Sequence, residues 1–169
     1  KAEKILIASG TRPKIPKIKG LDGTGFLTSD EALRLTKQPK VLTIIGGGYI
    51  GAELAHFYGA LGTKINIIQR RNAVLPAEDE EIASKFSEVF KRKYKLYLGY
   101  EPESVKKKGQ TFVVRASNSA SENIEIESDQ LLVSVGRTPN SDTLNLGATG
   151  VEIDDRGYVK VNEYLETTA

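Results

Sequence analysis

The sequence lacks cysteine, methionine and tryptophan, and these absences exclude several classes of protein. Without cysteine there is no disulfide framework, no zinc site built on thiolates and no thiol redox chemistry carried by these residues. The spacings of other metal sites, such as HExxH or an EF-hand loop, do not occur either, so we expect no metal site. A redox role for this chain would therefore depend on a bound cofactor.

The charge and the apolar runs exclude other classes. The 169 residues carry 24 Lys and Arg against 22 Asp and Glu, a net charge of only +2, so nucleic acid is a poor candidate partner. No run of about 18 apolar residues could span a bilayer, and no signal peptide is visible. These observations favour a cytoplasmic protein without nucleic-acid or membrane partners. Because the chain begins with Lys1 rather than Met, we expect it to be a piece of a larger protein.

Residues 40–69 form the clearest structural unit in the sequence. Residues 41–45 are an apolar, β-branched run followed by three glycines, which predicts a buried parallel strand. Apolar spacing then predicts a helix from Tyr49 to about residue 61, ended by Gly62. A strand at 64–69 completes a strand–helix–strand unit of about 30 residues, the length of a parallel crossover. The buried stripe of the helix is predicted to comprise Ile50, Leu54, Phe57, Tyr58 and Leu61.

Further elements are predicted on both sides of this unit. Residues 4–8 indicate a short buried strand, and a capping box at Thr28 and Glu31 predicts a short helix that ends near Pro39. A helix over residues 78–93 begins with acidic and ends with basic residues, as the helix dipole favours. Its predicted buried side chains are Ile82, Phe86, Val89 and Phe90.

After residue 98 the sequence changes to short segments separated by polar turns, which is typical of a β-meander. The predicted segments are residues 104–107, 111–116 and 122–127. We expect Lys106–Gly109 to form the first turn as a solvated hairpin tip. An apolar strand is predicted at 130–135 and a small hairpin at 151–161.

The glycines that follow the first parallel strand form a dinucleotide-binding pattern. Gly46-x-Gly48-x-x-Gly51 lies between a predicted strand and a predicted helix, the context in which GxGxxG is informative. Gly46 permits a tight turn, Gly48 lets the backbone approach a pyrophosphate, and Gly51 lets the helix pack close to the strand. Gly47 and Ile50 complete this candidate cofactor-binding turn. The alternative is a glycine-rich turn that binds nothing.

The end of the second parallel strand bears on the choice of dinucleotide. An acidic residue here usually accepts hydrogen bonds from the adenosine ribose, but this chain has Gln69, followed by Arg70 and Arg71. A guanidinium can pair with the 2′-phosphate of NADP, which favours NADP(H) with Arg70 as the main contact. Two alternatives stay open: the arginines are simply solvated, or, as Gly51 suggests, the cofactor is NAD.

Tyr49 and Glu53 are the candidate catalytic residues. They stand four residues apart in the predicted helix and project to nearly one side of it, beside the phosphate turn. They could reach the nicotinamide end of the cofactor, or they could be ordinary polar residues of a helix surface. His56 lies on the same flank without a Ser or Asp constellation, so we interpret it as a histidine that is either hydrogen-bonded within the protein or solvated.

Three motifs in one order give a resemblance to a known family. Residues 7–13 read IASGTRP, residues 44–53 read IIGGGYIGAE, and residues 135–140 read VGRTPN. Together they resemble the FAD-dependent pyridine nucleotide-disulfide oxidoreductases, which include dihydrolipoamide dehydrogenase and the glutathione, mycothione and mercuric reductases. The resemblance covers essentially the whole chain. Members of this family are longer, and their FAD-binding glycine motif, redox cysteine pair and interface domain are not in this sequence.

The resemblance implies a fold and a division into domains. The implied fold is α/β, a Rossmann-like three-layer arrangement in which a parallel sheet has helices on one face and a β-meander on the other. The implied NAD(P)-binding domain is residues 35–138. Residues 1–34 would be a flavin-domain remnant and connector, and residues 139–169 a connector and flavin-domain hairpin remnant.

The resemblance also implies roles for residues of the NAD(P) domain. Tyr49 would be an aromatic lid over the flavin ring, displaced when nicotinamide enters. Glu53 would position the nicotinamide carboxamide and a flavin-side lysine outside this chain. Pro102 falls where the family's backbone approaches the adenine, although a proline offers no N–H for a hydrogen bond there.

Two further segments are implied to contact the cofactors from the chain's ends. Ala8, Ser9 and Gly10 resemble the segment that approaches FAD. Gly136 and Arg137 resemble the segment that crosses back towards flavin and nicotinamide.

The implied function is hydride transfer between NAD(P)H and FAD and on to a small-molecule disulfide or similar acceptor, which these residues do not specify. This piece alone is expected to bind NAD(P) weakly and not to turn over, and the full-length protein to form a homodimer through a domain absent here. The alternative is a non-catalytic NAD(H)-sensing regulatory domain. Such a domain needs the glycine motif but neither flanking motif, so residues 7–13 and 135–140 discriminate against it.

Overall fold

The computed structural model describes residues 2–169, so Lys1 of the predicted range 1–34 lies outside the described residues. The chain divides into two compact units. One consists of Ile15–Gly136 and the other of residues 2–14 with Arg137–Ala169. In the part of the chain that is described, no helix is long and apolar enough to cross a membrane.

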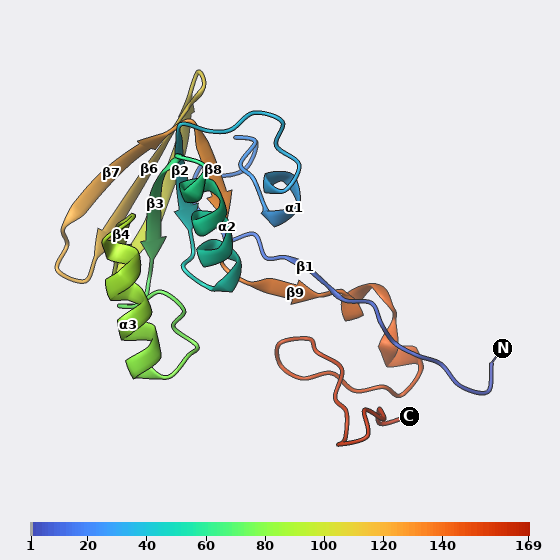
Figure 1. Ribbon diagram of the computed structural model, residues 1–169. Coiled ribbons are helices and arrows are strands. Elements are labelled where there is room, and N and C mark those ends of the chain that lie inside the picture. Colours follow the sequence, from blue (N-terminus) through green and yellow to red (C-terminus); the bar gives the residue numbers. More distant parts are fainter. Residues whose placement is uncertain (1) are drawn as a thin grey trace. The chain divides into compact units, whose positions relative to one another are not determined.

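The unit Ile15–Gly136 contains a four-stranded parallel sheet in the order β4-β3-β2-β8 (Figure 1). Pairs such as Ile44 with Ile67 and Ile44 with Leu132 fix the register of β2 between its two neighbours. The elements of this sheet and its helices are α1 (Ser29–Ala32), β2 (Val41–Ile45), α2 (Tyr49–Ala60), β3 (Lys64–Gln69), α3 (Glu80–Lys91), β4 (Lys95–Leu98) and β8 (Gln130–Val133).

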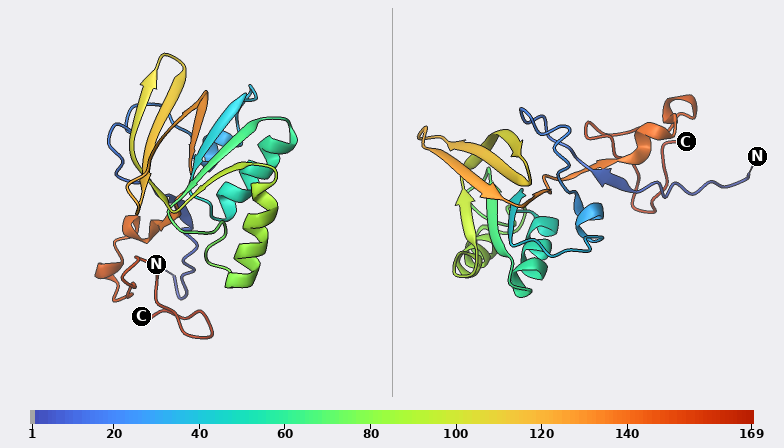
Figure 2. Two further views of the ribbon diagram at one scale, coloured as in Figure 1. Left: turned by 90° about the vertical axis from the view of Figure 1, so that its left-hand side faces the viewer. Right: turned by 90° about the horizontal axis from the view of Figure 1, so that it is seen from above.

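Apolar residues on both faces of this sheet form two separate cores. On one face Leu42 and Ile44 of β2 pack in a cluster with residues of the helices, such as Leu54 of α2 and Phe90 of α3. On the other face Ile45 packs in a cluster with residues of a second sheet. Side chains alternate along a strand, so an apolar run is buried only when both faces are covered. Figure 2 (left) shows the parallel sheet between the helices and the second sheet.

The second sheet is an antiparallel meander in the order β5-β6-β7. Its strands are β5 (Tyr100–Lys108), β6 (Thr111–Asn118) and β7 (Asn123–Ser128). Phe112 and Val114 of β6 are almost completely buried against the parallel sheet. A mixed α/β fold with one parallel and one antiparallel sheet is therefore confirmed for this unit.

The other unit is built on a short antiparallel pair. β1 (Thr11–Pro13) pairs with β9 (Arg137–Pro139), and two 3₁₀ helices follow, η1 (Asn140–Thr143) and η2 (Leu146–Ala148). The hairpin predicted at 151–161 is confirmed by a bridge between Ile153 and Val159. Its turn is closed by Asp154, whose carboxylate accepts the backbone N–H of Tyr158 at 2.8 Å.

Several local predictions are confirmed. The capping box of Thr28 and Glu31 is present at the start of α1, and Gly62 has the left-handed conformation (φ +94°) that ends α2. β2 and β3 have the predicted bounds, and α2 ends one residue before the predicted position. Residues close together in the sequence determine these features, which explains why the sequence indicates them.

The predicted buried strand at 4–8 is wrong. These residues have no regular structure, and Ile5 and Leu6 are 83% and 89% exposed. A strand needs a neighbour to bond its backbone, and none of the strands among residues 2–169 lies beside this segment. The helix predicted to end near Pro39 is also shorter, because α1 ends at Ala32.

The buried stripe predicted for α3 is partly wrong. Ile82 and Val89 are 54% and 41% exposed, whereas Ala83, Ser87 and Phe90 are buried. Small side chains at 83 and 87 let the helix approach the preceding loop, where the Ser87 hydroxyl accepts the Val74 N–H at 2.8 Å. Hydrophobicity alone does not predict that a helix buries the face that carries its small side chains.

Two other predictions need correction. In α2, Leu54 and Tyr58 are buried as predicted, but Phe57 and Leu61 at the stripe's edge are about half exposed. In the meander, Lys106–Lys108 lie in β5 rather than in the turn. Lys107 is not only solvated, since its ammonium donates to the Thr24 carbonyl at 2.7 Å and lies over the Phe112 ring. A lysine's long apolar stem permits both contacts.

Candidate functional site

The glycine turn between β2 and α2 is shaped by contacts that exclude side chains. Gly46 has φ +105°, and its N–H donates to the Ile68 carbonyl at 2.9 Å. A Cβ on Gly51 would lie 2.1 Å from the Gly46 carbonyl oxygen, so the first turn of α2 packs directly on this turn. Ser134, after β8, donates its hydroxyl to the same carbonyl at 2.9 Å. The turn is thus fixed at the carboxyl edge of the parallel sheet.

Gly48 differs from these glycines because it faces open space. It is the N-cap residue of α2 and receives no side-chain cap, and a Cβ there would meet nothing within 4 Å. No acidic residue occupies the first turn of α2. An uncapped helix N-terminus with an open backbone fits an anionic group such as a pyrophosphate. Ile50 is half-buried and packs on the helix-side core.

The side chain of Gln69 links the end of β3 to this turn. Gln69 is 9% exposed, and its Oε1 accepts the backbone N–H of Arg71 at 3.3 Å. A Cβ on Gly47 would lie 3.3 Å from Gln69 Nε2, so the amide lies against the glycine turn.

Arg70 and Arg71 are both exposed but are held differently. The Arg71 guanidinium donates to the Pro76 carbonyl at 3.1 Å. The Arg70 side chain makes no hydrogen bond or ion pair with any of residues 2–169. Arg70 is therefore the guanidinium that is available to an external anion.

The loop between β3 and α3 lies against the glycine turn. The Leu75 N–H donates to the Gly47 carbonyl at 2.7 Å, and the Tyr49 hydroxyl donates to Glu78 Oε1. This hydrogen bond, with a smaller contribution from burial, raises the pKa of the Tyr49 phenol. Sequence reasoning missed Glu78, Leu75 and Ser134, since no motif or spacing connects them to the turn.

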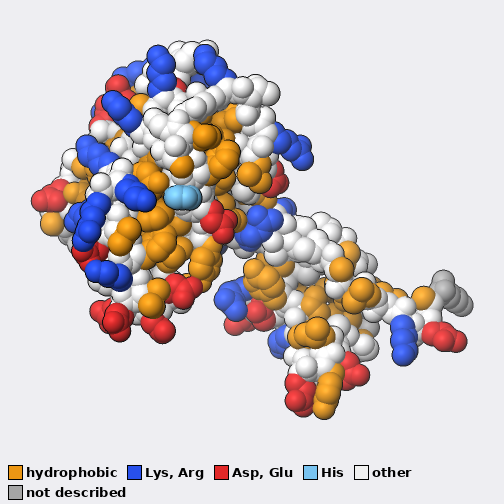
Figure 3. Space-filling model, viewed as in Figure 1, with side chains coloured by type: hydrophobic (Ala, Val, Ile, Leu, Met, Phe, Trp, Pro, Cys, Tyr) orange, Lys and Arg blue, Asp and Glu red, His pale blue; other side chains and the backbone are white. Residues whose placement is uncertain are grey.

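Tyr49 and Glu53 lie on the exposed side of α2, as their spacing predicts. Tyr49 is 53% exposed, and Glu53 and His56 are exposed as well. On this face Figure 3 shows hydrophobic side chains gathered among Lys, Arg, Asp and Glu. The accessible phenol and carboxylate can both interact with a molecule bound beside the turn.

Pro102 lies at an irregular place in the meander. It pairs with Ala116, and the register of β5 and β6 shifts between Pro102 and Ser104. Pro102 is half-buried, and no hydrogen bond within the described chain joins it to the glycine turn.

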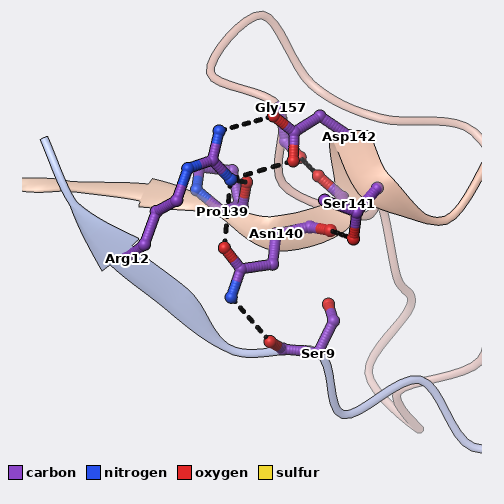
Figure 4. Close-up of polar contacts among 8 residues, drawn as sticks. Ser9, Arg12, Pro139, Asn140, Ser141, Asp142 and Gly157 are labelled. Carbon is purple, nitrogen blue, oxygen red and sulfur yellow. Dashed lines mark hydrogen bonds and ion pairs between the residues drawn. The ribbon is translucent and has the colours of Figure 1, made fainter.

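The remaining candidates lie at the ends of the chain. The Ser9 carbonyl accepts the Asn140 side-chain amide at 2.9 Å (Figure 4). The Gly10 carbonyl accepts the Asn140 N–H at 3.0 Å. Arg137 donates to the Thr11 carbonyl at 2.7 Å. Ala8 and Gly136 are exposed, and Gly136 has φ +130°.

An ion pair holds β1 and η1 together. Arg12 donates two hydrogen bonds to the Asp142 carboxylate, at 2.9 and 2.6 Å, and one to Asn140 Oδ1 at 3.0 Å (Figure 4). The Arg12 hydrogen bonds hold the pKa of Asp142 below its usual value. This cluster fixes the backbone of both flanking motifs in one arrangement. No group of three or more potential metal ligands occurs among residues 2–169.

Comparisons with known proteins match the chain along its whole length. Residues 1–169 match the family described as "Pyridine nucleotide-disulphide oxidoreductase". The chain is 39% identical to a mercuric reductase of Lysinibacillus sphaericus, over 99% of this chain and 31% of that protein. It is 37% identical to a dihydrolipoyl dehydrogenase of Buchnera aphidicola subsp. Schizaphis graminum, over 96% of this chain and 34% of that protein.

A solved structure gives a similar result. The HOCl-induced flavoprotein disulfide reductase RclA from Escherichia coli aligns with a TM-score of 0.83 and 30% identity. That alignment covers 95% of this chain and 36% of the other. The chain thus spans about a third of the length of the relatives that it matches.

Proposed function

The chain belongs to the pyridine nucleotide-disulphide oxidoreductase family, and from this we propose that residues 35–138 are the NAD(P)-binding domain of a longer flavoprotein. Family members are oxidoreductases that use FAD and NAD(P)H. The observation that carries the proposal is the open, uncapped N-terminus of α2 at Gly48. We also propose that this unit has the Rossmann-like layering of the family, which its two cores support.

In the proposed site the residues of the turn bind the dinucleotide's phosphates. The backbone of Gly46, Gly47 and Gly48 and the first-turn amides at Ile50 and Gly51 provide the cradle, in which the N–H groups of the first helical turn stabilise negative charge. Gln69 orients the end of β3 against this cradle through its contacts with Gly47 and Arg71.

At the adenosine end we propose that Arg70 binds the 2′-phosphate of NADP, with Arg71 in a supporting place. The support is that Arg70 is exposed and has no side-chain hydrogen bond or ion pair within the described part of the chain, while Arg71 is held by the Pro76 carbonyl. A guanidinium can form two parallel hydrogen bonds to one phosphate. Pro102 is proposed to contribute only an apolar contact to the adenine.

At the nicotinamide end Tyr49 and Glu53 are the proposed catalytic residues. When bound, the cofactors supply the hydride chemistry, which takes place between nicotinamide and flavin. Tyr49 would cover the flavin ring and exclude water from it until nicotinamide enters, and Glu53 would accept a hydrogen bond from the carboxamide and orient the nicotinamide ring. Ala8, Ser9, Gly10, Gly136 and Arg137 are the residues proposed to face FAD, which would be held mostly outside this chain.

For the whole protein we propose a cytoplasmic homodimer that passes electrons to a small-molecule disulfide or similar acceptor. Two kinds of relative, the mercuric reductase and the dihydrolipoyl dehydrogenase, support a soluble redox enzyme. The acceptor would be chosen by parts of the protein outside this chain.

Flavin reduction tests the proposed function. The purified full-length protein should be yellow, and NADPH should bleach the flavin absorption in anaerobic stopped flow. A protein that binds the dinucleotide without any bleaching would instead be an NAD(H)-sensing domain.

The choice of dinucleotide is tested by Arg70→Glu. Loss of a charged hydrogen-bonding partner, and its replacement by a repelling carboxylate, should weaken NADPH binding about 10- to 100-fold. NADH, which lacks the 2′-phosphate, should lose less than about threefold. Fluorescence titration measures both, and Arg71→Glu is the matched control with a smaller effect on NADPH. Equal losses for the two dinucleotides in Arg70→Glu would refute the NADP assignment.

A further inference from the structure

The middle of the loop between β3 and α3, residues 70–79, is fixed by its backbone. The Leu75 N–H bonds to Gly47, and the fully buried Val74 N–H bonds to Ser87. Leu75 has φ +53°, a left-handed conformation that costs a non-glycine residue energy and persists where its surroundings hold it. Its side chain packs on the helix-side core. This part of the loop therefore does not depend on a side-chain bond to α2.

Within residues 2–169, one side-chain hydrogen bond joins the far end of the loop to α2, and in it the Tyr49 hydroxyl donates to Glu78. Tyr49 is the first residue of α2, and Glu78 precedes α3 by two residues. Both side chains are exposed, so burial does not force them together. The pair joins the residue that flanks the glycine turn to the loop that begins with Arg70 and Arg71.

The charge of Glu78 conflicts with the ligand proposed for this place. Its carboxylate is bonded to the side chain of Tyr49, the first residue of α2, and the N-terminus of α2 is the proposed place of the dinucleotide's phosphates. Like charges within a Debye length of about 10 Å repel each other at physiological salt. The hydrogen bond between Tyr49 and Glu78 and a bound pyrophosphate thus compete for the same end of the helix.

We propose that Glu78 is a positioning residue of the dinucleotide site. In the free protein it holds the Tyr49 ring in place and ties the end of the 70–79 loop to α2. The phosphates of the incoming dinucleotide displace this contact, which releases Tyr49 and the loop together. The inference rests on the proposed function, because it takes the glycine turn as the phosphate cradle.

Dinucleotide affinity in a double-mutant cycle is the first test. Tyr49→Phe removes the hydroxyl and keeps the ring and the net charge, whereas Glu78→Ala removes the acceptor. Each should tighten NADPH binding about two- to fivefold, the range that one exposed hydrogen bond can supply. The double variant should bind no more tightly than the tighter single variant, because both remove the same contact.

Glu80→Ala is the control that separates the effect of removing a negative charge on NADPH affinity from the effect of losing the hydrogen bond between Tyr49 and Glu78. This variant removes a neighbouring carboxylate at the start of α3 that makes no bond to Tyr49. Equal tightening in Glu80→Ala, or an effect of Glu78→Ala that is as large with Phe at position 49 as with Tyr, would overturn the proposal.

Hydrogen exchange of residues 72–79 in the free protein is the second test, and it needs no dinucleotide. Exchange should be faster in Tyr49→Phe and Glu78→Ala and unchanged in Glu80→Ala. Glu78→Gln should keep the protection, because its amide oxygen can accept the same hydrogen bond. Unchanged exchange in both single variants would overturn the role of Glu78. Failure of the wild type to bind either NADPH or NADH would instead refute the proposed function, and the exchange result would still decide whether Glu78 holds the loop.

Discussion

Gly48 and Gly51 lie three residues apart, yet there is room for a side chain at Gly48 and none at Gly51. A Cβ on Gly51 would lie 2.1 Å from a backbone oxygen, whereas a Cβ on Gly48 would meet nothing within 4 Å. Gly51→Ala should therefore lower the free energy of unfolding by about 1–3 kcal/mol, as overpacking does. Gly48→Ala should cost about 1 kcal/mol or less, the difference between Gly and Ala at an N-cap. Urea unfolding measures both.

Dinucleotide binding should be weakened more by Gly48→Ala than by Gly51→Ala, which is the reverse of their order for loss of stability. The new methyl group of Gly48→Ala would occupy the space through which a pyrophosphate approaches the backbone. We expect it to abolish measurable NADPH binding in a protein that stays folded. Wild-type affinity in this variant would show that the phosphates do not bind at the open cradle.

The sequence identified these glycines because they belong to one short motif, in which the closest neighbour of Gly51 is the Gly46 carbonyl, five positions away. It could not identify Glu78, which lies 29 residues from Tyr49 and meets it only in the folded chain. Polar, exposed partners leave no periodic signal, so contacts of this kind need the structure.

At the scale of elements, the ion pair between Arg12 and Asp142 joins β1 to η1, the 3₁₀ helix that follows β9. Arg12 lowers the pKa of Asp142, so folding favours the charged carboxylate. The stabilisation is fully present above the ordinary carboxyl pKa of about 3.9 and is lost as the pH falls through the lowered value. Asp142→Asn should thus melt at a lower temperature than the wild type at pH 7.

The two melting curves should converge as the pH is lowered towards about 2, well below the ordinary carboxyl pKa. Circular dichroism against temperature at several pH values measures this. Glu152→Gln is the matched control, because it removes another exposed, ion-paired carboxylate of the same unit. A difference for Asp142→Asn that is independent of pH would contradict the explanation.

The elements that could be predicted are those with local signals. β2, β3 and α2 have an unbroken apolar run or a 3.6-residue period, and the capping box marks α1. The face that α3 buries could not be predicted, since it includes Ser87, whose hydroxyl bonds to a distant loop amide. The apolar residues 4–8 have the composition of a strand, but no strand of the described chain is hydrogen-bonded to them.

At the scale of the molecule, both apolar cores lie within residues 15–136. The other unit exposes large apolar side chains, among them Leu6, Tyr164 and Leu165. A protein consisting of residues 15–136 should therefore fold alone and unfold in one cooperative step, because it keeps all of the buried contacts of both cores. Far-UV circular dichroism during urea unfolding tests this. A gradual, non-cooperative loss of signal would show that the core depends on the chain's ends.

The position of β8 in the parallel sheet affects how the protein is made. β8 is the last strand in the order of the sheet and pairs with the interior strand β2, although the whole meander lies between them in sequence. On the ribosome β2 therefore has one open edge until residues 130–133 emerge, and contacts this distant form slowly. An open edge beside an apolar surface invites aggregation. A nascent chain that stalls before residue 130 would be a substrate for chaperones and proteases, whereas a few more residues complete the sheet.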